Sequence, residues 1–258
     1  MSETSEPTTD KAHADIGIVC ALKMELGPFL ARCDRVRKYV GGSFVFRGGF
    51  LGEARVAIVE SGAGFAKARR ATQALIDAHT PRWILSAGFS GALREDMRIG
   101  DIVVANSIVD THGHELSVDI NMESDPQHGL HVGRLVTADE IVRTIDEKRA
   151  LADRTGALAC DLESLAVAQV CQETRTRFMA IRSISDDLSR DLPAEVLTVL
   201  GGTGSIRAGA IAASLIKRPS SVSDMWKLRE QAQTAADKLS RFLDPIVEQL
   251  YEHRASGR

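Results

Sequence analysis

The sequence predicts an α/β protein that forms a single domain with three layers, α/β/α, around a mixed central sheet. Short segments that are apolar almost throughout alternate along the chain with longer segments whose apolar residues recur at helical spacing. Strands without polar alternation are typical of a parallel or mixed sheet that helices cover on both faces. Ligands of such sheets usually bind beyond the carboxyl ends of the strands.

The elements expected in the first part of the chain start with a buried strand at Asp15–Leu22 and a helix near Met24–Arg32. Strands separated by glycine turns follow at 37–51 and 54–61, and a helix at Gly64–His79. The other expected elements are strands at 82–89, 101–110, 130–138, 156–161 and 177–185, helices at 138–154 and 164–172, and an amphipathic helix at 226–250.

The ends of the chain are expected to differ from its middle. Residues 1–14 are polar and contain no apolar segment of a signal peptide, so they predict a disordered tail. One catalytic domain is expected at 15–258, and it ends in a helical C-terminal extension at about 192–258.

The composition excludes several kinds of partner. A net charge of −3 and 5% aromatic residues give no reason to expect nucleic acid. The sequence has no apolar run near the roughly 20 residues that a membrane span needs. The four cysteines show no CxxC spacing, which favours reduced cysteines in a cytoplasmic protein.

Glycine turns and histidines offer weaker signals. The sequence SGAGFAKA at 61–68 lacks the third glycine of a dinucleotide fingerprint, and AGFSGAL at 87–93 is a second glycine turn after a strand. Both fit either tight turns or backbone N–H groups that face an anion or a sugar. GGTGS at 201–205 is interpreted as a flexible turn, and His112 and His114 as solvated histidines, so we expect no metal.

Acidic residues at strand ends carry the stronger signal. Asp186 follows a buried strand with Ser185 before it, Glu25 follows the first strand, and Asp161 and Glu163 precede a helix of small apolar residues. Each carboxylate could cap or start the next helix, or it could bind a ligand. The residue pattern alone leaves both alternatives open.

In order, five segments resemble the nucleoside phosphorylase and nucleosidase superfamily, over roughly Ile16 to Asp187. They are IGIVCALKMEL, VESGAGFAKA, ILSAGFSGAL with IGDIVVAN, CDLESLAVAQVC and FMAIRSISDD. The branch that they resemble most is 5′-methylthioadenosine/S-adenosylhomocysteine nucleosidase. The resemblance implies a nucleoside phosphorylase-like fold and a homodimer.

The resemblance also implies roles for individual residues. Asp186 would be the general acid that protonates the purine at N7, and Glu25 the general base that acts on water. Glu163 would hold the ribose hydroxyls, and Arg182 would help to position the nucleophile. The other residues implied at the substrate are Leu162, Ser185, Gly88, Phe89, Ser61, Ile141 and Val142. Carboxylates suit this chemistry because cleavage of the bond passes through an oxocarbenium-like state.

The sequence departs from that branch in several places. Phe89 stands where the hydrolases usually have serine, and Ile141 with Val142 stands where a base-stacking aromatic is expected. The segment between His114 and Val136 is shorter. The part after Asp187, which includes LPAE, and the earlier DLES at 161–164 resemble phosphorylase-like proteins associated with hopanoid biosynthesis, which implies a large lipid at the 5′ carbon. We favour the alternative that its apolar IAASLI sequence packs at a subunit interface.

The predicted function is hydrolysis of the N-glycosidic bond of a purine nucleoside, with adenine as base and a 5′ substituent. Glu25 favours water as the nucleophile because a carboxylate repels bound phosphate. No cofactor is expected beyond water or inorganic phosphate as co-substrate. The alternatives are a phosphorylase, including one that acts on adenosylhopane, and a nucleoside-binding protein without activity.

Overall fold

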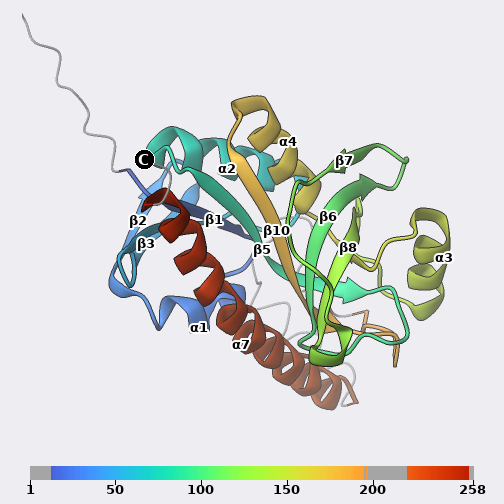
Figure 1. Ribbon diagram of the computed structural model, residues 1–258. Helices are drawn as coiled ribbons and strands as arrows, with labels where there is room; N and C mark the ends of the chain where they lie inside the picture. Colours follow the sequence, from blue (N-terminus) through green and yellow to red (C-terminus); the bar gives the residue numbers. More distant parts are fainter. Residues whose placement is uncertain (1–12, 195, 197–219, 256–258) are drawn as a thin grey trace, which may run out of the picture.

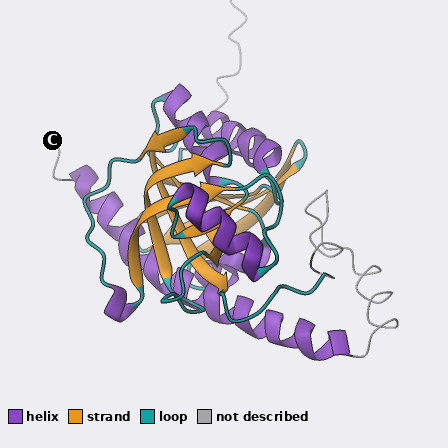
Figure 2. Cartoon of the chain, turned by 90° about the vertical axis from the view of Figure 1, so that its right-hand side faces the viewer, coloured by secondary structure: helices purple, strands orange, loops and turns teal. Residues whose placement is uncertain are grey.

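The computed structural model describes residues 13–194, 196 and 220–255, and it confirms the α/β fold with a mixed central sheet. The described strands form one ten-stranded sheet in the order β10-β6-β8-β9-β5-β1-β4-β3-β2, with β7 paired to β6. Helices lie against both faces of this sheet, which Figures 1 and 2 show from two directions. The expected tail is outside the described residues except for its last two positions, and so are GGTGS and IAASLI.

The first half of the sheet is built around β1 (Ile16–Cys20). This strand pairs in parallel with β4 (Ala54–Glu60) on one side and with β5 (Trp83–Ala92) on the other. β3 (Phe44–Leu51) and β2 (Asp34–Gly41) extend the sheet in antiparallel fashion to its edge. The parallel core therefore brings the carboxyl ends of β1, β4 and β5 to the same side of the sheet.

The second half of the sheet closes on itself. β10 (Arg177–Asp186) pairs with β5 in parallel and with β6 (Ile102–Asp110) in antiparallel fashion. β6 pairs with β8 (Leu130–Thr137), β8 with β9 (Ala159–Asp161), and β9 returns to β5. A small strand, β7 (Glu115–Ser117), lies outside this ring on β6. Because of the closure, Gly91 of β5 lies between Asp186 of β10 and Cys160 of β9.

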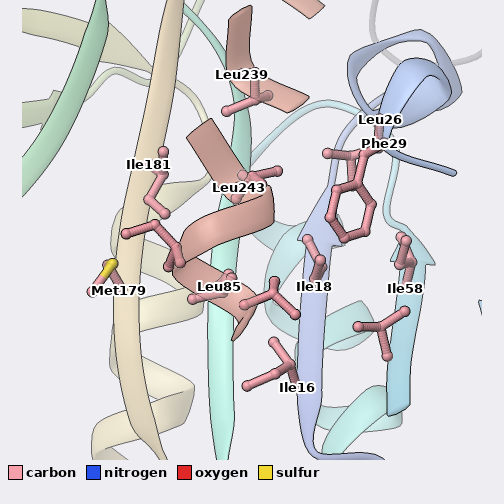
Figure 3. Close-up of a cluster of buried hydrophobic side chains, with 14 of the residues drawn as sticks. Ile16, Ile18, Leu26, Phe29, Ile58, Leu85, Met179, Ile181, Leu239 and Leu243 are labelled. Atoms are coloured by element: carbon pink, nitrogen blue, oxygen red, sulfur yellow. The ribbon is translucent and has the colours of Figure 1, made fainter. Parts of the chain in front are cut away.

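The helices explain why the strands have continuous apolar sequences. On β1, Ile16 and Ile18 belong to one buried cluster while Val19 belongs to another, so both faces of the strand are covered. The first cluster contains Leu239 and Leu243 of the long C-terminal helix α7 (Ser220–Ala255), as Figure 3 shows. On the other face, α2 (Phe65–His79) packs beside α4 (Ser164–Thr174).

Two expected helices are shorter than their sequences suggested. The segment after β1 forms a 3-10 turn, η1 (Lys23–Leu26), and a single turn of helix, α1 (Gly27–Leu30). The helix expected at 138–154 begins only at Ile145 as α3 (Ile145–Thr155), because Thr144 caps it. Its Oγ1 accepts a hydrogen bond from the Glu147 N–H, and Glu147 accepts one from the Thr144 N–H.

The remaining connections add little regular structure. A short 3-10 turn, η2 (Pro126–His128), precedes β8. The amphipathic segment at 226–250 lies within α7, as expected for a helix, and α7 continues through Pro245. Within the described ranges, the helices are too short or too polar to cross a membrane.

Candidate active site

A cavity of about 310 Å³ opens where β1, β5, β9 and β10 end. Its volume is that of a pocket for a small organic molecule. Most of the residues that the sequence predicted for the substrate line this cavity. They are Glu25, Phe89, Ile141, Val142, Leu162, Glu163, Ser185 and Asp186. Ser61, Gly88 and Arg182 do not line it.

Glu25 is held by the backbone at the end of β1. The turn η1 buries its side chain, and its two carboxylate oxygens accept hydrogen bonds from the N–H groups of Leu22, at 2.7 Å, and Phe89, at 3.0 Å. Burial raises the pKa of Glu25, while the charge of Arg182 and the backbone hydrogen bonds oppose that rise. A carboxylate with a raised pKa is a stronger base, so Glu25 is suited to accept a proton.

Gly88 leaves the space in which Glu25 and Arg182 approach each other. A Cβ atom at Gly88 would lie 2.4 Å from Arg182 Nη1 and 2.7 Å from Glu25 Oε1. Any side chain here would displace one of the two charged groups. The lack of space for a side chain therefore explains why this position of β5 is glycine. Gly88 affects the site through Glu25 and Arg182 and does not itself line the cavity.

Arg182 does not line the cavity, and it is 1% exposed. Its Nη2 lies 2.7 Å from Asp161 Oδ2 and 3.9 Å from Glu163 Oε2. The guanidinium also donates to the hydroxyls of Ser86 and Ser164, at 2.8 and 2.9 Å. Its other terminal nitrogen, Nη1, is buried and has no hydrogen-bond partner among the described residues. Arg182 therefore has one unused donor on the side of Glu25.

The two carboxylates of CDLES have different surroundings. Asp161 accepts hydrogen bonds from the Ser164 N–H, at 3.1 Å, and from the Thr137 hydroxyl, at 2.8 Å, so it starts α4 as well as pairing with Arg182. Glu163 lies at the N-cap position but does not cap the helix. Its Oε1 accepts a hydrogen bond of 2.8 Å from the N–H of Gly64.

Glu163 is a buried acid of this cavity with a raised pKa. Burial raises its pKa to about 7; the charge of Arg182 opposes the rise, and the charges of Asp161 and Glu25 add to it. Near neutral pH the side chain therefore exists in both forms. It is able to accept a hydrogen bond from a ligand hydroxyl, which is the contact that ribose offers.

Asp186 ends β10 with a partner on each carboxylate oxygen. The Ser185 hydroxyl donates to its Oδ1 at 3.0 Å, and the ammonium of Lys148 lies 2.5 Å from its Oδ2. Lys148 also donates to the backbone carbonyl of Asp187 at 3.1 Å. Its side chain is fully buried, whereas that of Asp186 is 15% exposed to the cavity. The carboxylate is thus held in one orientation beside the space for a ligand.

The sequence prediction missed Lys148, although its position carried a signal. Lys148, Leu151 and Thr155 follow one another at intervals of three and four residues, and all three are buried on the inner face of α3. A lysine on the apolar stripe of an amphipathic helix needs a partner in the interior. The sequence alone does not reveal that this partner is Asp186.

The remaining walls of the cavity are apolar. Ile141 and Val142 belong to the irregular segment before α3, and Leu162 lies beside Glu163. Hydrogen bonds between Arg143 and the backbone of Leu192 join this segment to the chain after β10. The outer part of the wall consists of Leu192, Val196, Leu228 and Ala232, the last two from α7.

Two residues of the weaker motifs, Ser61 and His114, do not line the cavity. The Ser61 hydroxyl donates to the backbone carbonyls of Cys20 and Gly62, so it supports the turn between β4 and α2 instead of facing a ligand. His114 is exposed and pairs with Asp110. No group of three or more potential metal ligands occurs within the described part of the chain.

The match to a family model covers most of the chain. The model is that of the phosphorylase superfamily, and it matches residues 15–129 and 118–247. The 5′-methylthioadenosine/S-adenosylhomocysteine nucleosidase of Shewanella sp. (strain W3-18-1) is 27% identical over 208 residues, which are 70% of this chain and 89% of that protein. The nucleosidase of the same name from Staphylococcus haemolyticus is 23% identical over 195 residues, 66% and 86% of the two chains.

Solved structures share the fold. The 5′-methylthioadenosine/S-adenosylhomocysteine nucleosidase of Helicobacter pylori, with butyl-thio-DADMe-Immucillin-A, superposes with a TM-score of 0.69 at 20% identity and covers 92% of this chain and 99% of its own. The futalosine hydrolase of the same organism has a TM-score of 0.67 at 20% identity and covers 91% and 97%.

Proposed function

The chain belongs to the phosphorylase superfamily, and from this premise we propose that it hydrolyses the N-glycosidic bond of an adenine nucleoside that carries a 5′ substituent. Within the superfamily, its relatives of 27% and 23% identity are named as nucleosidases for 5′-methylthioadenosine and S-adenosylhomocysteine. Purine nucleosides are therefore the substrate class to test first.

One observation carries the proposal: three carboxylates from separate strand ends line one cavity. Glu25 follows β1, Glu163 follows β9, and Asp186 ends β10. A site that only binds a nucleoside needs no such set, because buried carboxylates cost free energy unless they are paired. Bond cleavage does need them, since one group protonates the leaving base while another serves the nucleophile.

The proposed reaction divides the work among these residues. Asp186 delivers a proton to N7 of the purine, which makes the base a neutral leaving group. Glu163 accepts hydrogen bonds from the ribose hydroxyls and stabilises the positive charge that develops on the sugar. Glu25 takes a proton from the attacking water, and the buried charge of Arg182 acts on that water through Glu25.

Charge supports water over phosphate as the nucleophile. Five carboxylates, those of Glu25, Glu140, Asp161, Glu163 and Asp186, are among the lining residues. The one cation among the described lining residues is Arg229 of α7, which is exposed. A phosphate dianion beside Glu25 would face repulsion without a neighbouring lining cation, whereas water is neutral and gains a base.

The experiment is base release from 5′-methylthioadenosine, S-adenosylhomocysteine and inosine, with and without inorganic phosphate. We expect adenine and a free sugar at a rate that does not depend on phosphate. Formation of a sugar 1-phosphate would make the protein a phosphorylase. Absence of base release from every nucleoside in the series would refute the proposal.

The apolar outer wall favours a second candidate, which differs in the 5′ group. Leu192, Val196, Leu228 and Ala232 would surround a substituent that extends beyond the sugar. A bulky alkyl group there would bury more apolar surface than a methylthio group does, at about 25 cal/mol per Å². A series of adenosines with lengthening 5′-alkylthio chains tests this candidate: kcat/KM rises with chain length if the wall binds the substituent.

We also propose that the protein is a homodimer whose interface lies beside the cavity. Met24, which lines the cavity, is 39% exposed, and Phe65, which follows the Gly64 that binds Glu163, is 38% exposed. Large apolar side chains at the surface favour contact with a second copy. Light scattering should give twice the chain mass of 27.9 kDa.

A further inference from the structure

We propose that Lys148 is a positioning residue that fixes Asp186 and supplies the proton which Asp186 passes to the leaving base. The inference rests on the proposed function, because it assigns the source of the proton in that reaction. It goes beyond the set of residues at the substrate, since Lys148 itself does not line the cavity.

The first support is the burial of the pair. The Lys148 side chain is 0% exposed, and its Nζ lies 2.5 Å from Asp186 Oδ2. An ammonium without water is stabilised only by direct partners, and here these are the Asp186 carboxylate and the Asp187 carbonyl. The ammonium and the carboxylate therefore share a hydrogen bond along which a proton can pass.

The second support is that the fold delivers this lysine with little freedom. Thr144 and Glu147 cap α3, and Lys148 follows them in the first turn, on the same buried stripe as Leu151. At the other end, a Cβ atom on Gly91 would lie 2.9 Å from Asp186 Oδ2 and 3.4 Å from Lys148 Cε. The backbone of β5 thus closes one side of the pair.

The third support is that the two oxygens of the Asp186 carboxylate have different partners. Lys148 occupies one oxygen and the Ser185 hydroxyl the other, while the side chain remains 15% exposed at the cavity. Each carboxylate oxygen has two lone pairs, so both remain able to contact a ligand. Asp186 is the only member of the pair that lines the cavity, so a proton from Lys148 reaches a ligand through it.

Each proton that the reaction moves has a donor and an acceptor among Lys148, Asp186, Glu25, water and the base. As the glycosidic bond breaks, its electron pair goes to the base, and N7 takes a proton from Asp186. Asp186 takes one from the Lys148 ammonium and remains a carboxylate, while Lys148 becomes a neutral amine. Water adds to the sugar and gives its proton to Glu25. Exchange with solvent then returns one proton to Lys148 and removes one from Glu25.

The other titratable or charged groups near the pair are the thiol of Cys160 on β9 and, around a small cavity that Asp186 also lines, Arg190 and Asp191. Burial raises the pKa of Cys160 to about 12, so it remains neutral throughout the range in which activity is measured. Asp187 meets Lys148 through its backbone carbonyl, and its carboxylate accepts hydrogen bonds from Ser189. A change in the pH profile that follows substitution of Lys148 therefore reports on the Lys148–Asp186 pair.

The test is base release from 5′-methylthioadenosine by the full chain, from pH 5 to pH 9. Lys148→Met keeps the length of the side chain and removes its charge, and Arg149→Met on the exposed side of α3 is the matched control. We expect Lys148→Met to keep KM within about threefold and to lose roughly 10²- to 10⁴-fold in kcat at pH 7. The loss should shrink toward pH 5, because protons from solvent then replace the one that Lys148 supplies.

Two further variants separate proton supply from structural support. In combination with Asp186→Asn, Lys148→Met should cause no additional loss of kcat, because the two residues act as one unit. Lys148→Arg keeps the charge, but a guanidinium does not give up its proton. It should lose kcat as Lys148→Met does, and it keeps the inference testable if Lys148→Met fails to fold.

The outcomes are distinct. A wild-type pH profile and kcat in Lys148→Met or Lys148→Arg would overturn the inference and leave the proposed function intact. An equal loss at every pH with weakened substrate binding would also overturn it, since that pattern belongs to a structural role. Absence of base release by the wild type would overturn the proposed function and the inference together.

Discussion

Two buried ion pairs lie beside the same cavity, and they differ in what surrounds them. The pair of Arg182 and Asp161 is closed off, with side chains 1% and 0% exposed. The pair of Lys148 and Asp186 is closed on the lysine side, at 0%, and open on the aspartate side, at 15%. Distances are similar, at 2.7 and 2.5 Å, so exposure and not geometry separates the two pairs.

The difference indicates that a buried ion pair can serve two purposes in this fold, stability in one case and turnover in the other. The oxygens of Asp161 accept hydrogen bonds from the Ser164 N–H and the Thr137 hydroxyl and pair with Arg182, and its side chain is 0% exposed although it is one of the residues around the cavity. Asp186 also has partners that orient it, but its side chain is 15% exposed at the cavity. We therefore expect the closed pair to affect mainly stability and the open pair to affect mainly turnover.

Substitution in the open pair should have the largest effect. Asp186→Asn removes the acid but keeps the shape of the side chain, so we expect kcat to fall by about 10²- to 10⁴-fold or more with the fold retained. Steady-state assays of base release and circular dichroism measure the two quantities. Asp187→Asn is the matched control, because Asp187 meets Lys148 through its backbone. A fully active Asp186→Asn enzyme would remove Asp186 from the mechanism.

Substitution in the closed pair should instead reduce stability. Asp161→Asn leaves the buried Arg182 guanidinium without its nearest opposite charge, which costs about 3–5 kcal/mol. For a domain of this size, the melting temperature should fall by about 6–20 °C in calorimetry. Asp244→Asn, in the exposed pair with Arg32, is the control and should cost less than about 1 kcal/mol. Equal effects in both variants would contradict the distinction between closed and exposed pairs.

The sequence predicted the fold and the acidic residues of the cavity for a simple physical reason. Strands that are apolar throughout are visible without a structure, and Glu25, Glu163 and Asp186 each lie within five residues of a strand end. The parallel strands β1, β5 and β10 end on one side of the sheet, and β9, which is antiparallel to β5, ends at the same cavity. Local sequence therefore carried most of the information about these positions.

Contacts between distant segments were not accessible in the same way. Lys148 and Asp186 are 38 residues apart, and a lysine in an amphipathic helix is normally solvated. Ser61 was expected at the substrate because it follows a strand, but its hydroxyl turns back to the carbonyls of the same turn. The prediction that α3 begins at residue 138 was wrong. Apolar residues at helical spacing also occur before Thr144, but the helix begins only after the Thr144 cap.

Glu163 lies 3.9 Å from Arg182 of the closed pair, and its effect on stability should depend on pH. Its pKa is raised to about 7 in the fold from an ordinary value of 4.5. Below pH 4.5 the side chain is protonated in both states, and above pH 7 the folded protein carries a buried charge that the unfolded chain solvates. Stability is thus lost as pH rises through this window. Glu163→Gln removes that cost and should stabilise the protein at pH 8 by about 3 kcal/mol.

Thermal unfolding at pH 5 and pH 8 measures this effect. The stabilisation by Glu163→Gln should be below about 1 kcal/mol at pH 5, because the folded side chain is already protonated there. Glu173→Gln on α4, where the carboxylate is 55% exposed and pairs with Arg69, is the control and should show little change with pH. A Glu163→Gln effect that is equal at both pH values would show that its charge is not the cause.

Substitution of Thr137 should have the smallest effect on stability, because Thr137 supports the closed pair of Arg182 and Asp161 without carrying charge. Its hydroxyl donates to Asp161 Oδ1 at 2.8 Å and accepts from the Leu165 N–H at 3.0 Å. Thr137→Val keeps the shape but leaves both groups unsatisfied in the interior, at a cost of about 2 kcal/mol. Thr72→Val is the control, since that equally buried hydroxyl donates to a carbonyl inside α2.

For Thr137→Val, denaturant unfolding and base release should give different results, because the closed pair affects mainly stability. Denaturant unfolding should show the loss of stability, and it should exceed the loss in Thr72→Val because a buried N–H and a buried carboxylate oxygen both lose a partner. Base release at saturating substrate should stay within about threefold of wild type, because Asp161 retains Arg182 and the Ser164 N–H. A large loss of kcat with unchanged stability would mean that Asp161 acts on the reaction, and the two pairs would then share one role.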